Sequence, residues 1–251
     1  MFLSALDEVD SATTGMKGIG IVVPFDFAID DELWAFVPNN ITLHLTRTPA
    51  ISGPINLELA ELVSEEEPII TAIESLMSAN PEVIIYLCTS GSYLRGVEGE
   101  RSLCQTMKTV SNVEALTTSG ALLKALTVLG TKSVAVGTPH DRELSDLLVD
   151  FLNESGFEVP SIKYLSLDRD IHQLDDQSIL SLAESADHKM ADALFLSCTG
   201  LRAAHLIPEL ESRLGKPVLT ANQVSMWLAL NLIHVTPPIP HSLFGVKLID
   251  S

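Results

Sequence analysis

Two segments of the chain repeat one pattern of residues. Residues 83–91 read VIIYLCTSG and residues 193–200 read ALFLSCTG, so each is an apolar run that ends in Cys-Thr and then glycine. A short apolar run closed by a glycine turn is typical of a buried parallel strand, and ligands of open α/β sheets gather at the carboxyl ends of such strands. The repeat therefore predicts two related halves that contribute Cys88 and Cys198 to a shared cleft.

Apolar runs alternate with helical periodicity along the rest of the chain. Strands are expected at 18–24, 40–46, 83–87, 114–118, 133–137, 162–165, 193–197 and 216–220. Helices are expected at 30–37, 58–77 with an interruption near Pro68, 100–110, 121–129, 141–155, 176–188, 203–214 and 223–233. Strands that alternate with helices of this length predict an α/β fold with parallel sheets of four to five strands and flanking helices.

The same pattern suggests domain boundaries. Residues 1–17 are interpreted as an N-terminal tail, 18–116 as the first α/β domain and 117–221 as the second. Residues 222–251 are expected to return to the first domain, because their apolar helix around Trp227 needs a surface to pack on.

Composition excludes several partners. The 251 residues carry 15 Lys and Arg against 33 Asp and Glu, a formal net charge of −18. Such a charge repels nucleic-acid phosphates and anionic membrane surfaces, so neither is an expected partner. The sequence contains no run of about 18 apolar residues, so no transmembrane helix is predicted. An acidic substrate would instead be held locally by backbone N–H groups, hydroxyls or a few arginines, of which Arg47, Arg95 and Arg202 are candidates.

The cysteines indicate a compartment as well as a site. Three cysteines make an odd number, and the two repeated ones resemble strand ends rather than a disulfide framework. Together with the absence of a secretory pattern at the start of the sequence, this favours a cytoplasmic location. Cys104 lies within a predicted helix without an adjacent turn, so we interpret it as a core residue.

The repeated motif places each sulfur near the free N–H groups of a helix N-terminus. Such a position favours the thiolate, and the same groups can hold a carboxylate. Thr89, Ser90, Gly91, Thr199 and Gly200 are accordingly candidate substrate-binding residues, although each could simply cap its helix.

Other strand ends supply further candidates for binding the substrate. These are Pro24, Asp26, Thr118, Ser119 and His140. Thr118 or Ser119 could equally cap the following helix, and His140 could donate a hydrogen bond or carry charge. The remaining histidines have no spacing that predicts a metal site, so no metal or other cofactor is expected.

Five short motifs in this order resemble the aspartate/glutamate racemase superfamily, within it the branch of maleate cis-trans isomerases and arylmalonate decarboxylases. They are GIVVP at 20–24, CTSG at 88–91, TTSGA at 117–121, VAVGTP at 134–139 and SCTG at 197–200. The resemblance implies two pseudo-twofold-related domains with a cofactor-free active site between them. It further implies that Cys88 adds to a double bond of a small dicarboxylic acid and that Cys198 donates or accepts the proton. Homodimers or homotetramers are expected.

Two departures from this branch leave the substrate open. Maleate isomerases usually have asparagine in the loop where this chain has Phe25-Asp26-Phe27, and tyrosine where it has His140. Asp26 would repel a second carboxylate or instead attract an amino group. The Pro-Phe-Asp-Phe loop resembles that of racemase-like proteins of ectoine breakdown, which implies a racemase of an aspartate-like or ectoine-derived amino acid as the alternative. Arylmalonate decarboxylases have glycine in place of the first thiol, so Cys88 argues against decarboxylation. A module that binds an acid and senses oxidation through its thiols is the alternative outside enzymes.

Overall fold

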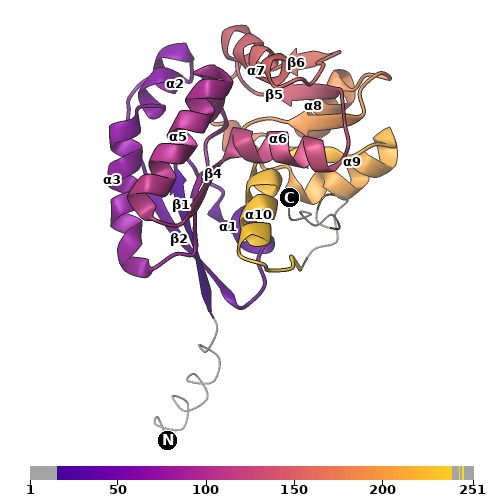
Figure 1. Ribbon diagram of the computed structural model, residues 1–251. Coiled ribbons are helices and arrows are strands. Elements are labelled where there is room, and N and C mark those ends of the chain that lie inside the picture. Colours follow the sequence, from indigo (N-terminus) through magenta and orange to yellow (C-terminus); the bar gives the residue numbers. More distant parts are fainter. Residues whose placement is uncertain (1–15, 239–242, 244, 246–251) are drawn as a thin grey trace, which may run out of the picture.

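The computed structural model describes residues 16–238, 243 and 245, which form two halves joined side by side (Figure 1). The expected tail therefore falls almost entirely outside the described residues, as does the end of the segment 222–251. The first half contains β1 (Lys17–Val23), α1 (Asp30–Ala35), β2 (Ile41–Arg47), α2 (Leu57–Val63), α3 (Glu66–Leu76), the 3-10 helix η1 (Met77–Ala79), β3 (Val83–Tyr86), α4 (Thr89–Tyr93), α5 (Gly96–Ser111), β4 (Glu114–Thr117) and α6 (Thr118–Val128). The second contains β5 (Val134–Thr138), α7 (Arg142–Glu154), β6 (Ile162–Tyr164), η2 (Ile171–Gln173), α8 (Asp176–Ala186), β7 (Ala193–Leu196), η3 (Ala204–Leu206), α9 (Ile207–Leu214), β8 (Val218–Thr220) and α10 (Ala221–Leu232).

Within this described part, the strands form two four-stranded parallel sheets of matching topology. Their orders are β2-β1-β3-β4 and β6-β5-β7-β8, so each strand of one half has a counterpart four strands later. β3 and β7, the strands that precede the two cysteines, are inner strands, and all their residues are buried. The predicted α/β fold with two similar halves is confirmed.

Several helices begin elsewhere than the sequence suggests. The predicted helix at 58–77 is two helices, and the break comes at Ser64 and Glu65 instead of Pro68. Pro68 lies in the first turn of α3, where backbone N–H groups have no partner within the helix, so the missing N–H of proline costs no hydrogen bond. The short helix α4 was not expected. α6 begins at Thr118 because Thr117 is its N-cap and accepts a hydrogen bond from Gly120 N at 3.0 Å.

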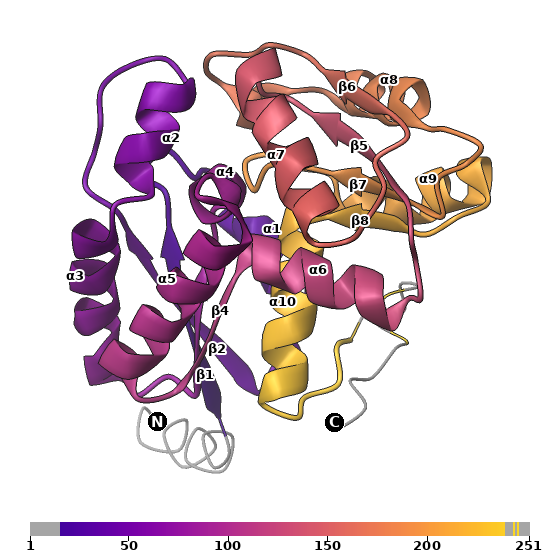
Figure 2. The same ribbon diagram turned by 45° about the horizontal axis from the view of Figure 1, so that its top comes forward.

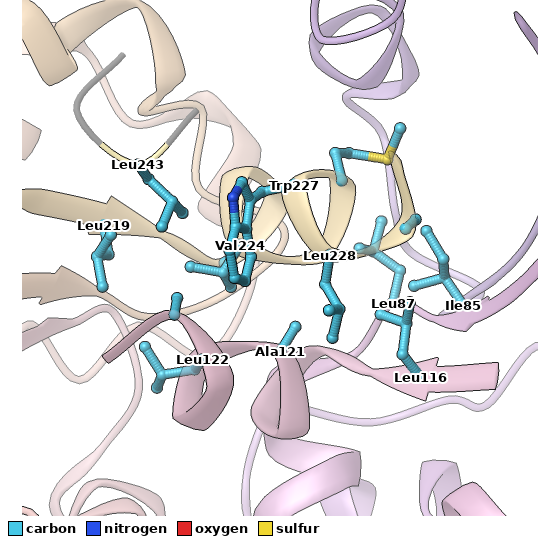
Figure 3. Packing of buried hydrophobic residues seen from close by; sticks show 14 of the residues in the cluster. Ile85, Leu87, Leu116, Ala121, Leu122, Leu219, Val224, Trp227, Leu228 and Leu243 are labelled. Atoms are coloured by element: carbon cyan, nitrogen blue, oxygen red, sulfur yellow. The ribbon is translucent and has the colours of Figure 1, made fainter. Parts of the chain in front are cut away.

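The helix after each sheet's last strand joins the two halves. α6 and α10 pack against each other, and α10 also contacts β3 and β4 of the first sheet. Figure 3 shows Trp227 and Leu228 of α10 beside Ala121 and Leu122 of α6, with Leu87 of the first half nearby. Trp227 is fully buried, as expected for an apolar helix that fills the space between two sheets. The view in Figure 2 shows α6 and α10 lying between the two sheets.

No helix in the described ranges has the length and apolar character needed to cross a bilayer.

Candidate active site

A cavity of about 250 Å³ opens where the carboxyl ends of both sheets face each other. Its volume is just below the roughly 300–1,000 Å³ typical of small-molecule sites, which suits a small ligand. From the first half it is lined by Pro24, Phe25, Asp26, Phe27, Gly53, Ile55, Asn56, Leu59, Ala60, Val63, Cys88, Thr89 and Ser90. From the second half it is lined by His140, Asp168, Arg169, Asp170, Ile171, His172, Cys198 and Gly200. Both repeated cysteines therefore line one cavity, each from its own half.

Cys88 is the N-cap of α4. Its sulfur accepts a hydrogen bond from Gly91 N at 3.4 Å and lies 3.9 Å from Ser90 Oγ. The Tyr86 hydroxyl also adjoins the sulfur, but it donates its one proton to Val63 O at 2.6 Å. We therefore assign the stabilisation of a Cys88 thiolate to Gly91 and Ser90.

Glycine is required at position 91 by this arrangement. A Cβ there would collide with the Tyr86 hydroxyl and would lie 3.1 Å from Cys88 Sγ. Gly91 does not line the cavity; it acts from behind the sulfur.

Cys198 has a strained backbone, with φ at +98°, a region that residues other than glycine rarely occupy. The N–H groups of Gly200 and Leu201 point toward its sulfur and favour the thiolate. A non-glycine residue held at positive φ costs about 1–3 kcal/mol, and such strain concentrates at functional sites.

The expectation that both sulfurs favour the thiolate is wrong for the structure as it stands. Burial raises the pKa of Cys88 and raises the pKa of Cys198 to about 12, and the nearby Asp26 carboxylate acts in the same direction. The N–H groups near each sulfur offset only part of the cost of moving a charge out of water. Both groups are therefore neutral thiols at pH 7.

Two buried polar atoms at the cavity have no hydrogen-bond partner among the described residues. They are Thr89 Oγ1 and His140 Nδ1. Burial lowers the pKa of His140 to about 4, so its imidazole is neutral at pH 7 and offers a donor or an acceptor instead of a charge. Buried polar atoms in proteins are nearly always paired, so both atoms have capacity for a hydrogen bond with a ligand or a water molecule.

Asp26 lies at the exposed edge of the cavity, where partial loss of water raises its pKa. Its loop is braced by Arg47, which donates to Phe27 O at 3.0 Å and pairs with Asp30 at 2.9 Å. Arg47 is thus a structural residue here and not a carboxylate clamp.

Like Gly91, three further predicted binding residues lie behind the cavity instead of lining it. Thr118 Oγ1 is 3.4 Å from Tyr86 O, and Ser119 Oγ donates to Thr89 O at 3.2 Å. Thr199 O accepts a hydrogen bond from Asn222 Nδ2 at 3.0 Å. All three residues are buried.

Two loops at the cavity were missed by the sequence analysis. Residues 53–56 follow β2 and residues 168–172 follow β6, so they occupy equivalent places in the two halves. They meet through a hydrogen bond of 2.8 Å from Ile55 N to Asp168 O. The repeat itself was the available signal, because loops after equivalent strands of two facing halves are expected to face each other.

In the part of the chain that the structure describes, the arginines offer no free clamp for a carboxylate at the cavity: Arg169 lines it but is paired, and Arg95 and Arg202 lie outside it. Arg169 pairs with the adjacent Asp168 at 3.0 Å, and Arg202 pairs with Asp31 outside the cavity. Arg95 also lies outside it. Among the described residues, no group of three or more His, Cys, Asp or Glu side chains is arranged to hold a metal ion. Cys104 donates to Ala115 O at 3.2 Å, away from the cavity.

Comparisons with known proteins agree with this fold. A family model described as arylmalonate decarboxylase matches residues 60–240. A maleate isomerase of Pseudomonas putida is 26% identical over 243 residues, covering 90% of this chain and 96% of that protein. An arylmalonate decarboxylase of Bordetella bronchiseptica is 27% identical over 170 residues, covering 66% and 71%.

A solved structure has the same fold. It is a serine variant of the Nocardia farcinica maleate cis-trans isomerase with a covalently bound succinylcysteine intermediate, and it superposes with a TM-score of 0.84. The sequences are 21% identical, and the match covers 92% of this chain and 98% of that one. Since the family model spans well over half of the chain, the chain belongs to the arylmalonate decarboxylase family and is an enzyme of the branch that its sequence motifs indicate.

Proposed function

We propose that the protein is a cofactor-independent isomerase that uses two thiols on a small dicarboxylic acid, as a maleate cis-trans isomerase does. The observation that carries the proposal is that Cys88 and Cys198 come from equivalent strand ends and line one small cavity. Two thiols on opposite sides of a planar acid can act on its two faces without a metal or a cofactor.

In this reaction Cys88 is the nucleophile. The fraction of Cys88 that has lost its proton to solvent reacts: its thiolate forms a C–S bond to one alkene carbon, and the π electrons move toward the carboxylate of the other carbon. Cys198 donates its proton to that carbon, which gives a succinyl thioether. After rotation about the new single bond, the Cys198 thiolate removes a proton from the same carbon and the C–S bond breaks. The succinylcysteine of the Nocardia variant supports the first step, the addition of a cysteine sulfur to an alkene carbon.

The division of roles rests on the surroundings of each sulfur. Cys88 has an N–H group and a hydroxyl near its sulfur. Cys198 has two N–H groups near its sulfur, but burial outweighs them and raises its pKa to about 12, so Cys198 retains its proton. The Thr89 hydroxyl and His140 are the unpaired groups available to bind substrate oxygen atoms.

Asp26 favours a second candidate from the same class of reaction. Its carboxylate lines the cavity and forms no ion pair with the described residues, so it would attract an ammonium group and repel a second carboxylate. Racemisation of an aspartate-like or ectoine-derived amino acid uses the same pair of thiols, with one removing the α-proton and the other delivering a proton to the opposite face.

The test is a panel of maleate, aspartate and methylmalonate in deuterated water followed by NMR. Fumarate from maleate indicates cis-trans isomerisation, and deuterium at the α-carbon of aspartate indicates racemisation. Cys88→Ser and Cys198→Ser should each abolish turnover. Cys104→Ser is the matched control, because its sulfur lies outside the cavity, and it should retain full activity.

Two results would contradict the two-thiol reaction. Full activity of Cys88→Ser with release of carbon dioxide from methylmalonate would identify a one-thiol decarboxylase. Ligand binding without turnover of any acid would instead support a module that binds acids and senses oxidation.

A further inference from the structure

The turns that carry the two thiols are held from behind by residues that the cavity does not expose. In both halves, the carbonyl oxygen of the threonine after the cysteine accepts a hydrogen bond from a buried side chain. Ser119 Oγ donates to Thr89 O at 3.2 Å, and Asn222 Nδ2 donates to Thr199 O at 3.0 Å.

These two donors occupy equivalent positions in the repeat. β4 and β8 are counterparts in the two sheets, and each ends at a threonine that caps the next helix. Ser119 and Asn222 each follow their capping threonine, Thr117 or Thr220, by two residues. The same contact is thus built twice with different side chains, which a chance contact would not explain.

Each donor is fixed in turn by another buried residue. Ser92 Oγ lies 2.7 Å from Ser119 Oγ, 2.7 Å from Cys88 O and 2.9 Å from Thr89 O, so Ser92 and Ser119 together hold the first turn. Asn222 Nδ2 also donates to Glu32 Oε1 at 2.8 Å.

Glu32 links the second turn to the opposite half. It belongs to α1 of the first half, and its other carboxyl oxygen accepts a hydrogen bond from Ala204 N at 3.2 Å. The side chain is only 6% exposed. The Cys198 turn is therefore held by a residue from across the interface. The helix α4 that follows Cys88 also reaches across it, because Tyr93 of α4 donates through its hydroxyl to Leu144 O at 3.0 Å.

We propose that Ser119 and Asn222 are paired positioning residues, each of which sets the place of one reactive thiol, and that Glu32 holds Asn222. A turn that keeps Cys198 at φ +98° needs such support, because a strained backbone persists only where its surroundings determine it. This inference rests on the proposed two-thiol function for its meaning, but its test does not need turnover.

The test is alkylation of the reduced protein with iodoacetamide at several pH values, with Cys88 and Cys198 followed separately by mass spectrometry. Asn222→Ala should loosen only the second turn and speed the labelling of Cys198 by about tenfold, the effect of one lost hydrogen bond. Ser119→Ala should speed the labelling of Cys88 alone, and by less than tenfold, because Ser92 Oγ still contacts Thr89 O at 2.9 Å. Each variant is the control for the other.

Two further variants separate positioning from general loosening of the fold. Ser111→Ala removes a buried serine that donates to Met107 O at 2.8 Å in α5, and it should change neither thiol. Glu32→Gln should affect Cys198 and leave Cys88 unchanged. Where a substrate has been found, Ser119→Ala and Asn222→Ala should lower kcat by up to about 10²-fold with little change in KM, as expected for a misplaced reacting group.

Labelling that changes equally at both cysteines, or at neither, would overturn the inference. If Asn222→Ala does not fold, Asn222→Ser retains a shorter donor and should give an intermediate change at Cys198 only. Selective labelling without turnover of any acid would leave the positioning role standing and contradict only the proposed function.

Discussion

The unequal backbones of the two cysteines predict opposite stability orders for glycine and alanine. Cys88 has φ −146°, which any residue adopts, and Cys198 has φ +98°. At position 88, Cys88→Ala should be more stable than Cys88→Gly, because glycine in a regular backbone costs roughly 0.5–1 kcal/mol relative to alanine. At position 198 the order should reverse, since glycine alone adopts positive φ without strain.

The size of the reversal follows from the strain at position 198. Glycine's extra entropy in the unfolded chain enters both comparisons and cancels in their difference. The methyl group of alanine also largely cancels, because the native cysteine has a Cβ at both positions. What remains is the backbone strain, about 1–3 kcal/mol. For a chain of this size, each kcal/mol shifts Tm by roughly 2–4 °C.

The assay is urea unfolding of the four single variants, followed by circular dichroism under reducing conditions. All four variants lack one thiol, so the loss of sulfur packing does not bias the order within either pair. If alanine is more stable than glycine by the same margin at both positions, the turn at Cys198 is not strained and the argument for its support by Asn222 loses its basis.

The remaining predictions concern pH. His140 is held neutral with a pKa of about 4, whereas the unfolded chain takes up its proton near pH 6.5, so stability should fall by about 3 kcal/mol as the pH drops from 6.5 to 4. Urea unfolding at the two pH values should show no such loss in His140→Gln. If the variant loses as much unfolding free energy as the native protein between pH 6.5 and 4, His140 is not buried as a neutral group. The catalytic rate should still increase with pH above about 8.5, the pKa of an ordinary thiol, because the raised pKa of Cys88 means that its thiolate forms only at higher pH. Cys198 keeps its proton up to about pH 12. Initial rates from pH 6 to 10 test this, and a maximum near pH 7 would contradict it.

The sequence predicts the sheets and the position of Cys88 and Cys198 at one cavity, because both depend on local pattern. The apolar runs before Cys88 and Cys198 form inner strands, and the repeat places their ends at one cavity. Parallel strands buried on both faces need continuous apolar runs, and such runs are visible without knowledge of tertiary contacts.

What the sequence does not reveal depends on contacts between distant segments. The residues of α4, TSGSY, are poor helix formers, and the helix forms where Ser92 contacts Ser119. The loops at 53–56 and 168–172 have no regular pattern, and they line the cavity because they meet each other. The expectation that the thiols are ionised fails for the same reason. The motif indicates the nearby N–H groups, but it does not show how deeply the sulfur atoms are buried.

Burial of the thiols bears differently on the two steps of the proposed reaction. For each unit by which a thiol's pKa exceeds the pH, its thiolate population falls tenfold, while its nucleophilicity rises by only about threefold. Burial therefore slows the addition of sulfur to carbon, so the nucleophile should be the thiol with the better set of donors. A thiol that still holds its proton at neutral pH can donate it to the carbanion-like carbon, which is the stronger base, and the thiolate left behind is basic enough to remove it again. Cys88 has Gly91 N and Ser90 Oγ beside it, whereas Cys198 has a pKa of about 12 despite the N–H groups of Gly200 and Leu201. The same burial that makes Cys198 a poor nucleophile thus suits it to donate the proton and remove it again. The assignment of roles follows from the surroundings of each sulfur.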